Sequence, residues 1–322
     1  MLITIPLLIL LTAVIPIIFI RFKKHYKKGI LRRSKETWAI GIYKGTSPLK
    51  LLPPLDINNP ILTAQDVTDV KARFVADPFM IKNQEGYYLF FEVLNDKRNL
   101  GELGYAFSSD GLHWQYRKII LKERFHLSYP YVFFWEENYY MIPECAKSGG
   151  IQLYKAKAFP EEWEHIETLI KGKGGMSALV DPSILYYNNH WYLFSYAPKS
   201  KNLHLFTAET ITGKWKEHPK SPVVSGSAHY ARPGGRVLLH ENTIYRYAQD
   251  ETPNYGTKVW AFRITEMSID NYSEELASEE PILYPGKEWW NKDGMHTIDA
   301  HQHKPGEWIA AVDGFTITPV FD

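Results

Sequence analysis

Acidic and other polar residues recur at matching places of a phrase that the sequence repeats four times. The phrase is anchored by prolines that are 52, 52 and 51 residues apart, namely Pro78, Pro130, Pro182 and Pro233. The residue before each proline is, in chain order, Asp77, Tyr129, Asp181 and Arg232. Fourteen residues after the first three prolines stand Glu92, Glu144 and Tyr196. Hydrolysis of a glycosidic bond requires two carboxyl groups, one charged and one kept protonated.

The Asp and Glu residues at these two positions are therefore candidates for catalysis or substrate binding. An Asp-Pro pair is also a common start of a strand or turn, so its repetition can reflect duplicated architecture. Against that, Tyr129 and Arg232 occupy the same place in other copies, so the architecture does not demand aspartate. Arg232 is suited to lower the pKa of a neighbouring aspartate or to bind an anionic group of a substrate.

A histidine-rich segment near the end of the sequence offers further candidates. His301 and His303 form an HxH pattern that places both rings on one face of a strand, and His296 and Asp299 precede them. The segment lacks a local acidic cluster, so we predict no metal, no cofactor, and a substrate-binding role for His296. The ARPGGR segment with Arg232 resembles an anion-binding loop. It lacks the lysine of a phosphate loop and opens no helix, which argues against nucleotide binding.

The repeat also predicts the elements that position these side chains. Each copy runs from the proline through a hydrophobic run, a polar break and an aromatic-rich strand, and two further strands follow. Four short strands per repeat are typical of one blade of a β-propeller. Four blades occupy about residues 72–284, and a fifth begins at Met295. We predict an all-β, five-bladed β-propeller over residues 37–322, whose last blade is completed by segment 37–55.

The first strand of each propeller blade lines the central axis, so equivalent residues of the blades form a ring. The fifth blade would contribute His296 or Asp299 to this ring. The acidic residues of the two repeated positions would then converge near one axial funnel, with Arg232 among them.

The first twenty residues contain no charged side chain, and eight basic residues follow by residue 35. An apolar run of this length spans the roughly 30 Å hydrocarbon core of a bilayer. The basic residues come after the run, whereas a signal peptide carries them before it. We predict a transmembrane anchor over 1–20, a basic juxtamembrane segment over 21–36, and a single-pass membrane protein with a cytoplasmic propeller. The lone Cys145 fits a reducing compartment. After residue 36, 29 basic residues face 35 acidic ones, which argues against nucleic-acid binding.

Several unusual strings connect residues 72–315 with one family. In chain order they are ADPF from Ala76, FFE ending at Glu92, HLSYPYVF from His126, MIPE ending at Glu144, ARPGG from Ala231, QD at Gln249 and Asp250, YG at Tyr255 and Gly256, Met295 with His296, and WIAAVDG from Trp308. With them the sequence resembles the N-terminal domain of plant glucosamine inositolphosphorylceramide transferases and its stand-alone bacterial relatives. That domain is similar to the five-bladed propellers of glycosidase families 43, 32 and 68, which use an axial trio of carboxylates.

The resemblance implies roles by position. Asp77 matches the base or nucleophile of blade one, and Asp181 matches the transition-state aspartate of the family 32 pattern. Glu144 is then the best available acid. Tyr129 stands where family 43 has a modulating aspartate, which is a departure from family 43 chemistry. The expected substrate-binding residues are Glu92, Tyr129, Arg232, His296 and Asp299.

Two functions of different classes follow. The first is a membrane-anchored, glycosidase-like propeller that processes or transfers a sugar on a glycolipid or polysaccharide precursor. The second is a non-catalytic glycan-binding or scaffold module that serves a separate glycosyltransferase, because the plant proteins carry such a domain after the propeller. Carboxylates across an open pocket favour the enzyme, and carboxylates paired with Arg232 or Arg236 favour the binding module. An axis plugged by side chains favours a purely structural propeller.

Overall fold

The structure is a computed structural model that describes residues 34–172, 174 and 178–319. Of two compact units, the larger comprises residues 38–316, and the described residues 34–37 and 317–319 belong to the other. The larger unit contains every residue for which a chemical role was predicted. The predicted anchor over 1–20, and the basic segment up to residue 33, lie outside the described residues. Among the residues that are described, no helix is both long enough and apolar enough to cross a membrane.

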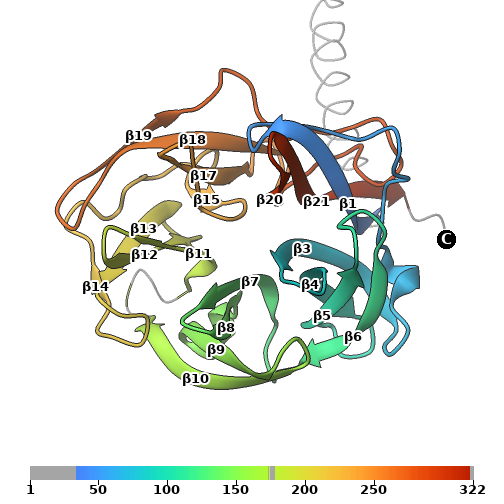
Figure 1. Ribbon diagram of the computed structural model, residues 1–322, viewed down its shortest axis with the longest axis horizontal. Helices are drawn as coiled ribbons and strands as arrows, with labels where there is room; N and C mark the ends of the chain where they lie inside the picture. Colours follow the sequence, from blue (N-terminus) through green and yellow to red (C-terminus); the bar gives the residue numbers. More distant parts are fainter. Residues whose placement is uncertain (1–33, 173, 175–177, 320–322) are drawn as a thin grey trace, which may run out of the picture. The chain divides into compact units, whose positions relative to one another are not determined.

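Residues 38–316 form a β-propeller of five antiparallel sheets around a central axis (Figure 1), which confirms the predicted all-β class and blade number. Blade one contains β3 (Ala72–Lys82), β4 (Tyr87–Asn95), β5 (Leu100–Ser108) and β6 (Gln115–Leu121). Blade two contains β7 (Ser128–Trp135), β8 (Asn138–Glu144), β9 (Gly150–Ala158) and β10 (Glu162–Lys171). Blade three contains β11 (Val180–Tyr187), β12 (His190–Ala197), β13 (Asn202–Ala208) and β14 (Lys216–Glu217). Blade four contains β15 (Arg232–Pro233), β16 (Leu238–His240), β17 (Thr243–Asp250), β18 (Lys258–Met267) and β19 (Tyr272–Leu276).

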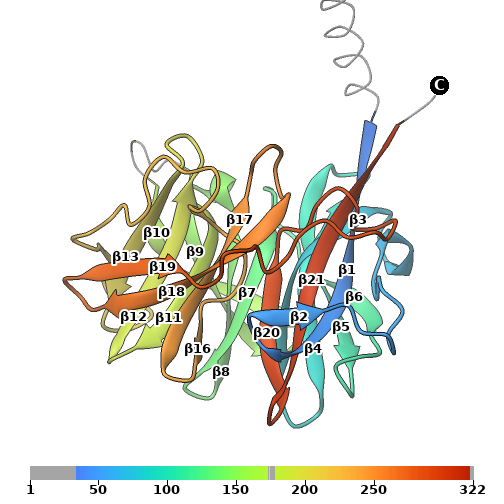
Figure 2. The same cartoon turned by 90° about the horizontal axis from the view of Figure 1, so that it is seen from above.

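The fifth blade combines strands from both ends of the chain. Its order is β2-β1-β21-β20, with β1 (Ser34–Ser47), β2 (Lys50–Leu52), β20 (Ile298–Lys304) and β21 (Glu307–Pro319). Figures 1 and 2 show blue β1 beside red β21. Pairing of early and late strands within this blade closes the ring of five blades. Two short 3-10 helices, η1 (Ala64–Asp66) and η2 (Ala146–Ser148), lie in connecting segments.

The apolar residues of the repeat pack between neighbouring blades rather than into a single core. Strand β4 is buried along its whole length, because a neighbouring blade covers each of its faces. One cluster joins Leu89 of blade one to Ile309 of blade five, and another joins Leu153 of blade two to Leu193 of blade three. Each blade is therefore held by its two neighbours, which fixes the spacing of the strands around the axis.

The tryptophans that mark the second half of the repeat share one local role. The indole N–H groups of Trp114, Trp163 and Trp215 each donate to a backbone carbonyl three or four residues earlier, at 3.1, 2.7 and 3.0 Å. Each ring thereby closes the turn before the outermost strand while its body packs on the blade. The repetition of the sequence is thus a repetition of the same turn.

Candidate active site on the propeller axis

Three of the predicted ring residues share a backbone conformation that is uncommon outside glycine. Asp77, Tyr129 and Asp181 have φ angles of 54°, 47° and 49°. At each of them the register between the first two strands of the blade shifts, as in a β-bulge. The proline that follows has a fixed φ and no N–H, so it cannot continue the ladder. Bulges re-aim side chains, and left-handed residues other than glycine gather at functional sites.

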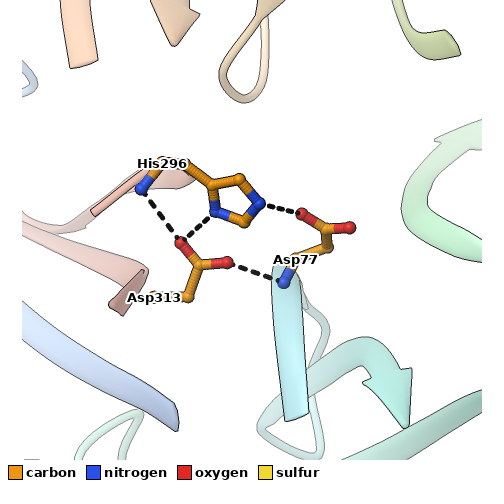
Figure 3. A group of neighbouring side chains, drawn as sticks. All are labelled: Asp77, His296 and Asp313. Atoms are coloured by element: carbon orange, nitrogen blue, oxygen red, sulfur yellow. Dashed lines mark hydrogen bonds and ion pairs between the residues drawn. The ribbon is translucent and has the colours of Figure 1, made fainter. Parts of the chain in front are cut away.

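Asp77 of blade one contacts His296 and Asp313 of blade five (Figure 3) and also a residue of blade two. Its Oδ1 lies 3.3 Å from Nε2 of His296 and accepts a hydrogen bond from the Thr297 hydroxyl at 3.1 Å. Its Oδ2 accepts from the backbone N–H of Tyr129 at 3.2 Å. The other ring nitrogen of His296, Nδ1, lies 2.8 Å from Oδ1 of Asp313.

The pKa values of Asp77 and His296 are both raised in these surroundings. Burial raises the pKa of Asp77 to about 7, although the charge of His296 opposes the rise. Burial by itself would lower the pKa of His296, but the charge and hydrogen bond of Asp313, together with Asp77, raise it to about 9. At neutral pH the imidazole is therefore positively charged, and Asp77 is poised to exchange a proton.

Blades two and three bring a second pair of carboxyl groups together. Glu144, at the end of β8, lies beside Asp181, near the start of β11. Desolvation, followed by the charge and hydrogen bond of Asp181, raises the pKa of Glu144 well above its usual range. The proton of the pair therefore resides on Glu144, which is partly exposed, whereas Asp181 is buried. A reachable protonated acid beside a buried carboxylate is the arrangement of a general acid.

Arg232 of blade four holds the other side of Asp181. Its Nε donates to Oδ2 of Asp181 at 2.6 Å, and its Nη1 donates to Oε1 of Glu251 at 3.0 Å. The side-chain amide of Gln249 donates to the same Asp181 oxygen at 2.9 Å. The half-exposed ring of Tyr255 covers the guanidinium at 4.7 Å. Asp181 is thus fixed in orientation by a cation, which the sequence analysis associated with a binding module.

We call Asp77, Glu144, Asp181, Arg232, His296 and Asp313 the axial acid cluster. Glu92 of β4 adjoins it, since its charge contributes to the raised pKa of Asp77. Glu92 is buried, and its Oε1 lies 3.1 Å from Nε2 of His126. The geometry there is not that of a hydrogen bond, and this oxygen has no hydrogen-bond partner in the described part of the chain.

Tyr129, predicted to bind substrate, lies in the interior. Its ring is fully buried against Phe79, with ring centres 4.7 Å apart. Its hydroxyl accepts from the Gly235 N–H at 2.7 Å and lies 3.0 Å from both the Gly235 carbonyl oxygen and the Ser183 hydroxyl. The side chain of blade two therefore bridges blades three and four, and its polar atom is fully engaged within the protein.

Asp299, the other predicted ligand from blade five, belongs to a separate group of charges. Its carboxylate accepts from Nε of Arg236 at 2.7 Å and lies 2.9 Å from Nε2 of His301. Although burial opposes it, Arg236 and then His301 lower the pKa of Asp299 to about 2. Arg236 also donates to the carbonyls of Met80 and Val132. We call Asp299, Arg236 and His301 the Arg236 cluster; it links blades one, two, four and five.

The described residues contain one group with the side chains and spacing of a metal site. Asp77, His296 and Asp313 offer ligand-type atoms that all lie within 4.8 Å of one another. Both ring nitrogens of the histidine face carboxylate oxygens, Nδ1 that of Asp313 and Nε2 that of Asp77. The HxH pattern does not form such a group, because His301 pairs with Asp299 whereas His303 pairs with the Tyr87 hydroxyl at 2.8 Å.

Sequence reasoning assigned no role to Asp313, Gln249, Glu251 or Tyr255. Asp313 lies in the WIAAVDG string, on the second strand of its blade, opposite Thr297. Glu92 and Glu144 occupy the second strands of blades one and two at the corresponding level, opposite residues 76 and 128. Aligning second strands rather than prolines would have found Asp313, since blade five lacks the anchor proline.

Comparison with solved structures shows the propeller fold of several sugar-acting enzymes. A family 117 glycoside hydrolase from Zobellia galactanivorans has a TM-score of 0.53 at 16% identity, over 87% of this chain and 90% of the other. A β-1,2-mannobiose phosphorylase from Listeria innocua has a TM-score of 0.59 at 13% identity, over 84% and 96%. An α-L-arabinofuranosidase from Podospora anserina has a TM-score of 0.54 at 10% identity, over 77% and 92%. At these identities the likeness concerns the fold alone.

Sequence comparison then identifies the family and confirms the resemblance carried by the motifs. Residues 32–315 match the family described as glucosamine inositolphosphorylceramide transferase 1, N-terminal, and the chain belongs to it. Glucosamine inositolphosphorylceramide transferase 1 of Oryza sativa subsp. japonica is 35% identical over 311 residues, which cover 89% of this chain and 41% of the rice protein. The Arabidopsis thaliana protein of that name is 31% identical over 313 residues, covering 90% and 40%. The chain thus spans about two fifths of the length of these relatives.

Proposed function

We propose that the propeller is a carbohydrate-active enzyme of the glycosidase type, which cleaves or transfers a glycosyl group of a glycolipid or polysaccharide precursor at the axial acid cluster. The observation that carries the proposal is that Glu144 lies beside Asp181, which raises the pKa of Glu144 well above its usual range, while Asp77 is held separately. The fold shared with sugar-acting enzymes supports it, as do the plant relatives named as glucosamine inositolphosphorylceramide transferases.

In the hydrolytic version, Glu144 donates its proton to the leaving glycosidic oxygen while the bond from that oxygen to the anomeric carbon breaks. Asp77 accepts a proton from the water whose oxygen forms the new bond to that carbon. A pKa of about 7 suits a general base that works near neutral pH. Exchange of one proton with solvent then restores both carboxyl groups. In the transfer version, a hydroxyl group of an acceptor takes the place of the water.

Asp181 has two tasks in this mechanism. Its negative charge keeps the proton on Glu144 before the reaction, because two adjacent carboxylates cannot both ionise easily. It also stabilises positive charge that develops on the sugar ring, the role expected from the sequence. Arg232 keeps Asp181 in place through Nε and retains 15% exposure of its side chain, so it also suits an anionic group of the substrate.

Aromatic and polar residues around the cluster provide the substrate contacts. Tyr255 is 41% exposed and covers Arg232, with its ring 5.3 Å from that of His296. An exposed ring in this place can pack on the apolar face of a sugar. On the Asp77 side, His126 is 36% exposed, and Glu92 raises the pKa of His126 although burial opposes the shift. A charged His126 can donate a hydrogen bond to a sugar hydroxyl.

A lipid-linked substrate is proposed because of the N-terminal sequence. Residues 1–20 would anchor the chain in a membrane and the basic residues 21–36 would keep the propeller on the cytoplasmic side. Extraction of the full chain from cell membranes with alkaline carbonate, followed by protease treatment of sealed vesicles, checks both statements. Release by carbonate would contradict the anchor, and a propeller protected within right-side-out cells but cleaved in inverted vesicles would agree with the orientation.

The catalytic proposal is tested with the full chain purified in detergent and incubated with glycolipids and glycans of defined structure. Products are read by mass spectrometry. We expect turnover in the native chain and in Asp96→Asn, a control carboxylate that pairs with Arg73 away from the cluster. We expect a loss of about 10²- to 10⁴-fold in Glu144→Gln. Equal turnover in Glu144→Gln and Asp96→Asn would contradict the proposal.

The salt bridge between Arg232 and Asp181 favours a second candidate function, a glycan-binding module that presents substrate to a separate glycosyltransferase. This candidate predicts that the same glycolipids bind without conversion. It also predicts that Arg232→Met weakens binding while Glu144→Gln does not. Binding without products in the assay above would therefore favour the module over the enzyme.

A further inference from the structure

His296 lies between two buried carboxylates that come from different blades (Figure 3). Its Nδ1 is 2.8 Å from Asp313 Oδ1, and its Nε2 is 3.3 Å from Asp77 Oδ1. A neutral imidazole has one N–H and one bare nitrogen, so it can donate to one of these carboxylates while its lone pair opposes the other. The Nδ1 contact has the geometry of a hydrogen bond and the Nε2 contact has the distance of an ion pair, and only the doubly protonated ring attracts both carboxylates. The geometry therefore calls for an imidazolium.

Asp313 is itself held rigidly by the backbone. It is fully buried, and the N–H groups of His296, Thr297 and Asp77 donate to it at 3.3, 2.9 and 2.8 Å. A buried carboxylate without a cation is costly, and His296 is the cation in contact with it. Asp313 thus fixes both the position and the charge of the histidine.

The remaining surroundings of His296 agree with a positive ring. Asp181 adds a further negative charge nearby. The ring of Trp38 lies 4.3 Å away and that of Tyr255 lies 5.3 Å away, and aromatic faces favour a cation. The opposing charge is Arg232, which contacts Tyr255 at 4.7 Å and is itself paired with Asp181 and Glu251.

We propose that Asp313 is a positioning residue that holds His296 as an imidazolium, which in turn fixes Oδ1 of Asp77 and leaves Oδ2 to act on the substrate. Oδ1 receives the histidine and the Thr297 hydroxyl, whereas Oδ2 receives a single N–H, that of Tyr129. His296 then orients Asp77 instead of contacting the sugar. The consequence for catalysis rests on the proposed function, but the charge state of His296 does not.

The charge state is measured on the full chain in detergent, labelled with ¹⁵N in its histidine rings. Two-bond ¹H–¹⁵N correlation spectra show whether one or both ring nitrogens carry a proton, and His296→Gln assigns the signal. We expect both nitrogens of His296 to be protonated at pH 7.5, where free histidine is neutral. A singly protonated ring at that pH would overturn the proposal, even if no variant folds.

A metal ion in place of the proton is the competing outcome. The same three side chains would then bind it through a bare Nε2, and elemental analysis of the purified chain would find one equivalent of metal. Such a metal, lost in His296→Gln, would overturn the proposal. We expect none that depends on His296, and no change in turnover after treatment with a chelator.

Asp313→Asn separates a positioning role from a merely structural one. Asparagine keeps an oxygen for the N–H groups of His296 and Thr297 and removes the charge, while its amide nitrogen replaces the oxygen that accepts from the Asp77 N–H. We expect the pKa of His296 to fall by at least about one unit. The charge of Asp313 also raises the pKa of Asp77, and His296 stays charged near pH 7 after a fall of this size, so we expect the acid limb of the pH–rate profile to move to lower pH. An unchanged His296 titration would overturn the proposal. If Asp77→Asn retains turnover while His296 is doubly protonated, the proposed function fails and this inference stands.

Discussion

The propeller contains two groups of charged side chains that are built from the same residue types but differ in the ratio of carboxyl groups to basic side chains. In the Arg236 cluster, one carboxylate faces a guanidinium and an imidazole, and the pKa of Asp299 is lowered to about 2. In the axial acid cluster, four carboxyl groups share Arg232 and His296, and burial raises the pKa of Asp77 to about 7. A carboxylate with a guanidinium of its own, such as Asp299, stays ionised in a permanent ion pair. Where carboxyl groups outnumber the basic side chains, as in the axial acid cluster, some of them hold protons that can be exchanged.

This difference separates stability from chemistry within one molecule. A buried charge with a complete set of partners holds the blades together, and removal of one partner leaves an uncompensated charge. Carboxyl groups that compete for few cations are costly to the fold but suited to acid–base catalysis. The two clusters should therefore respond to substitution in opposite ways, the axial acid cluster through activity and the Arg236 cluster through stability.

The largest expected effect is on activity, in Asp77→Asn. Loss of the base should lower turnover by about 10³-fold or more, or about 4 kcal/mol in the activation free energy. The variant should stay folded, with a free energy of unfolding within about 1 kcal/mol of the native value. Turnover by mass spectrometry and urea unfolding measure the two quantities. A large loss of stability with little change in turnover would show that Asp77 has a structural role, and would contradict the assignment of chemistry to the axial acid cluster.

The next largest effect is on stability, in Arg236→Met. The change leaves the buried Asp299 with only His301 and the Met80 N–H as partners, so the free energy of unfolding should fall by about 3–5 kcal/mol. The double variant with Asp299→Leu should recover much of the loss, because no buried charge then remains without its partner. Urea unfolding measures both. Equal stability of the native chain and Arg236→Met would remove the structural role assigned to this cluster.

The pH dependence of stability provides a third contrast. The pKa of His296 is raised to about 9 in the folded chain, against about 6.5 in an unfolded one. Its contribution is therefore complete below pH 6.5 and is lost as the pH rises through 9, by about 3 kcal/mol. Urea unfolding at pH 6.5 and 9.5 should show this loss, and His296→Gln should reduce it. If the native chain and His296→Gln lost the same amount of stability between pH 6.5 and 9.5, the loss would come from titratable groups other than His296.

The smallest effect concerns Tyr129, which connects the two regions. Its backbone N–H donates to Asp77, and its hydroxyl bonds to Gly235, next to Arg236. Tyr129→Phe leaves the buried Gly235 N–H without this acceptor, so unfolding should become easier by about 1–2 kcal/mol. We expect KM for the substrate to stay unchanged, since the hydroxyl is engaged within the protein. A higher KM with native stability would instead support the substrate-binding role predicted from the sequence.

The sequence by itself determined the architecture. Proline-anchored copies 52, 52 and 51 residues apart, with two aromatic-rich strands each, predicted the blades, because each blade forms from a continuous segment with local turns. The same spacing placed Asp77, Tyr129 and Asp181 on one ring, and all three have a positive φ. It also brought out the motifs by which the family was recognised.

Only the tertiary structure decided which of these residues meet and what charge they carry. Asp313 stands in the WIAAVDG string, where no anchor proline marks it, yet it accepts a hydrogen bond from the backbone N–H of Asp77, 236 residues away. Tyr129 and Asp299 stand at predicted ring positions but are engaged within the protein, whereas Glu144 meets Asp181 across a blade boundary. The physical reason is that a pKa depends on burial and on charges within a few ångströms. In a propeller those charges come from other blades, at sequence distances that no local pattern records.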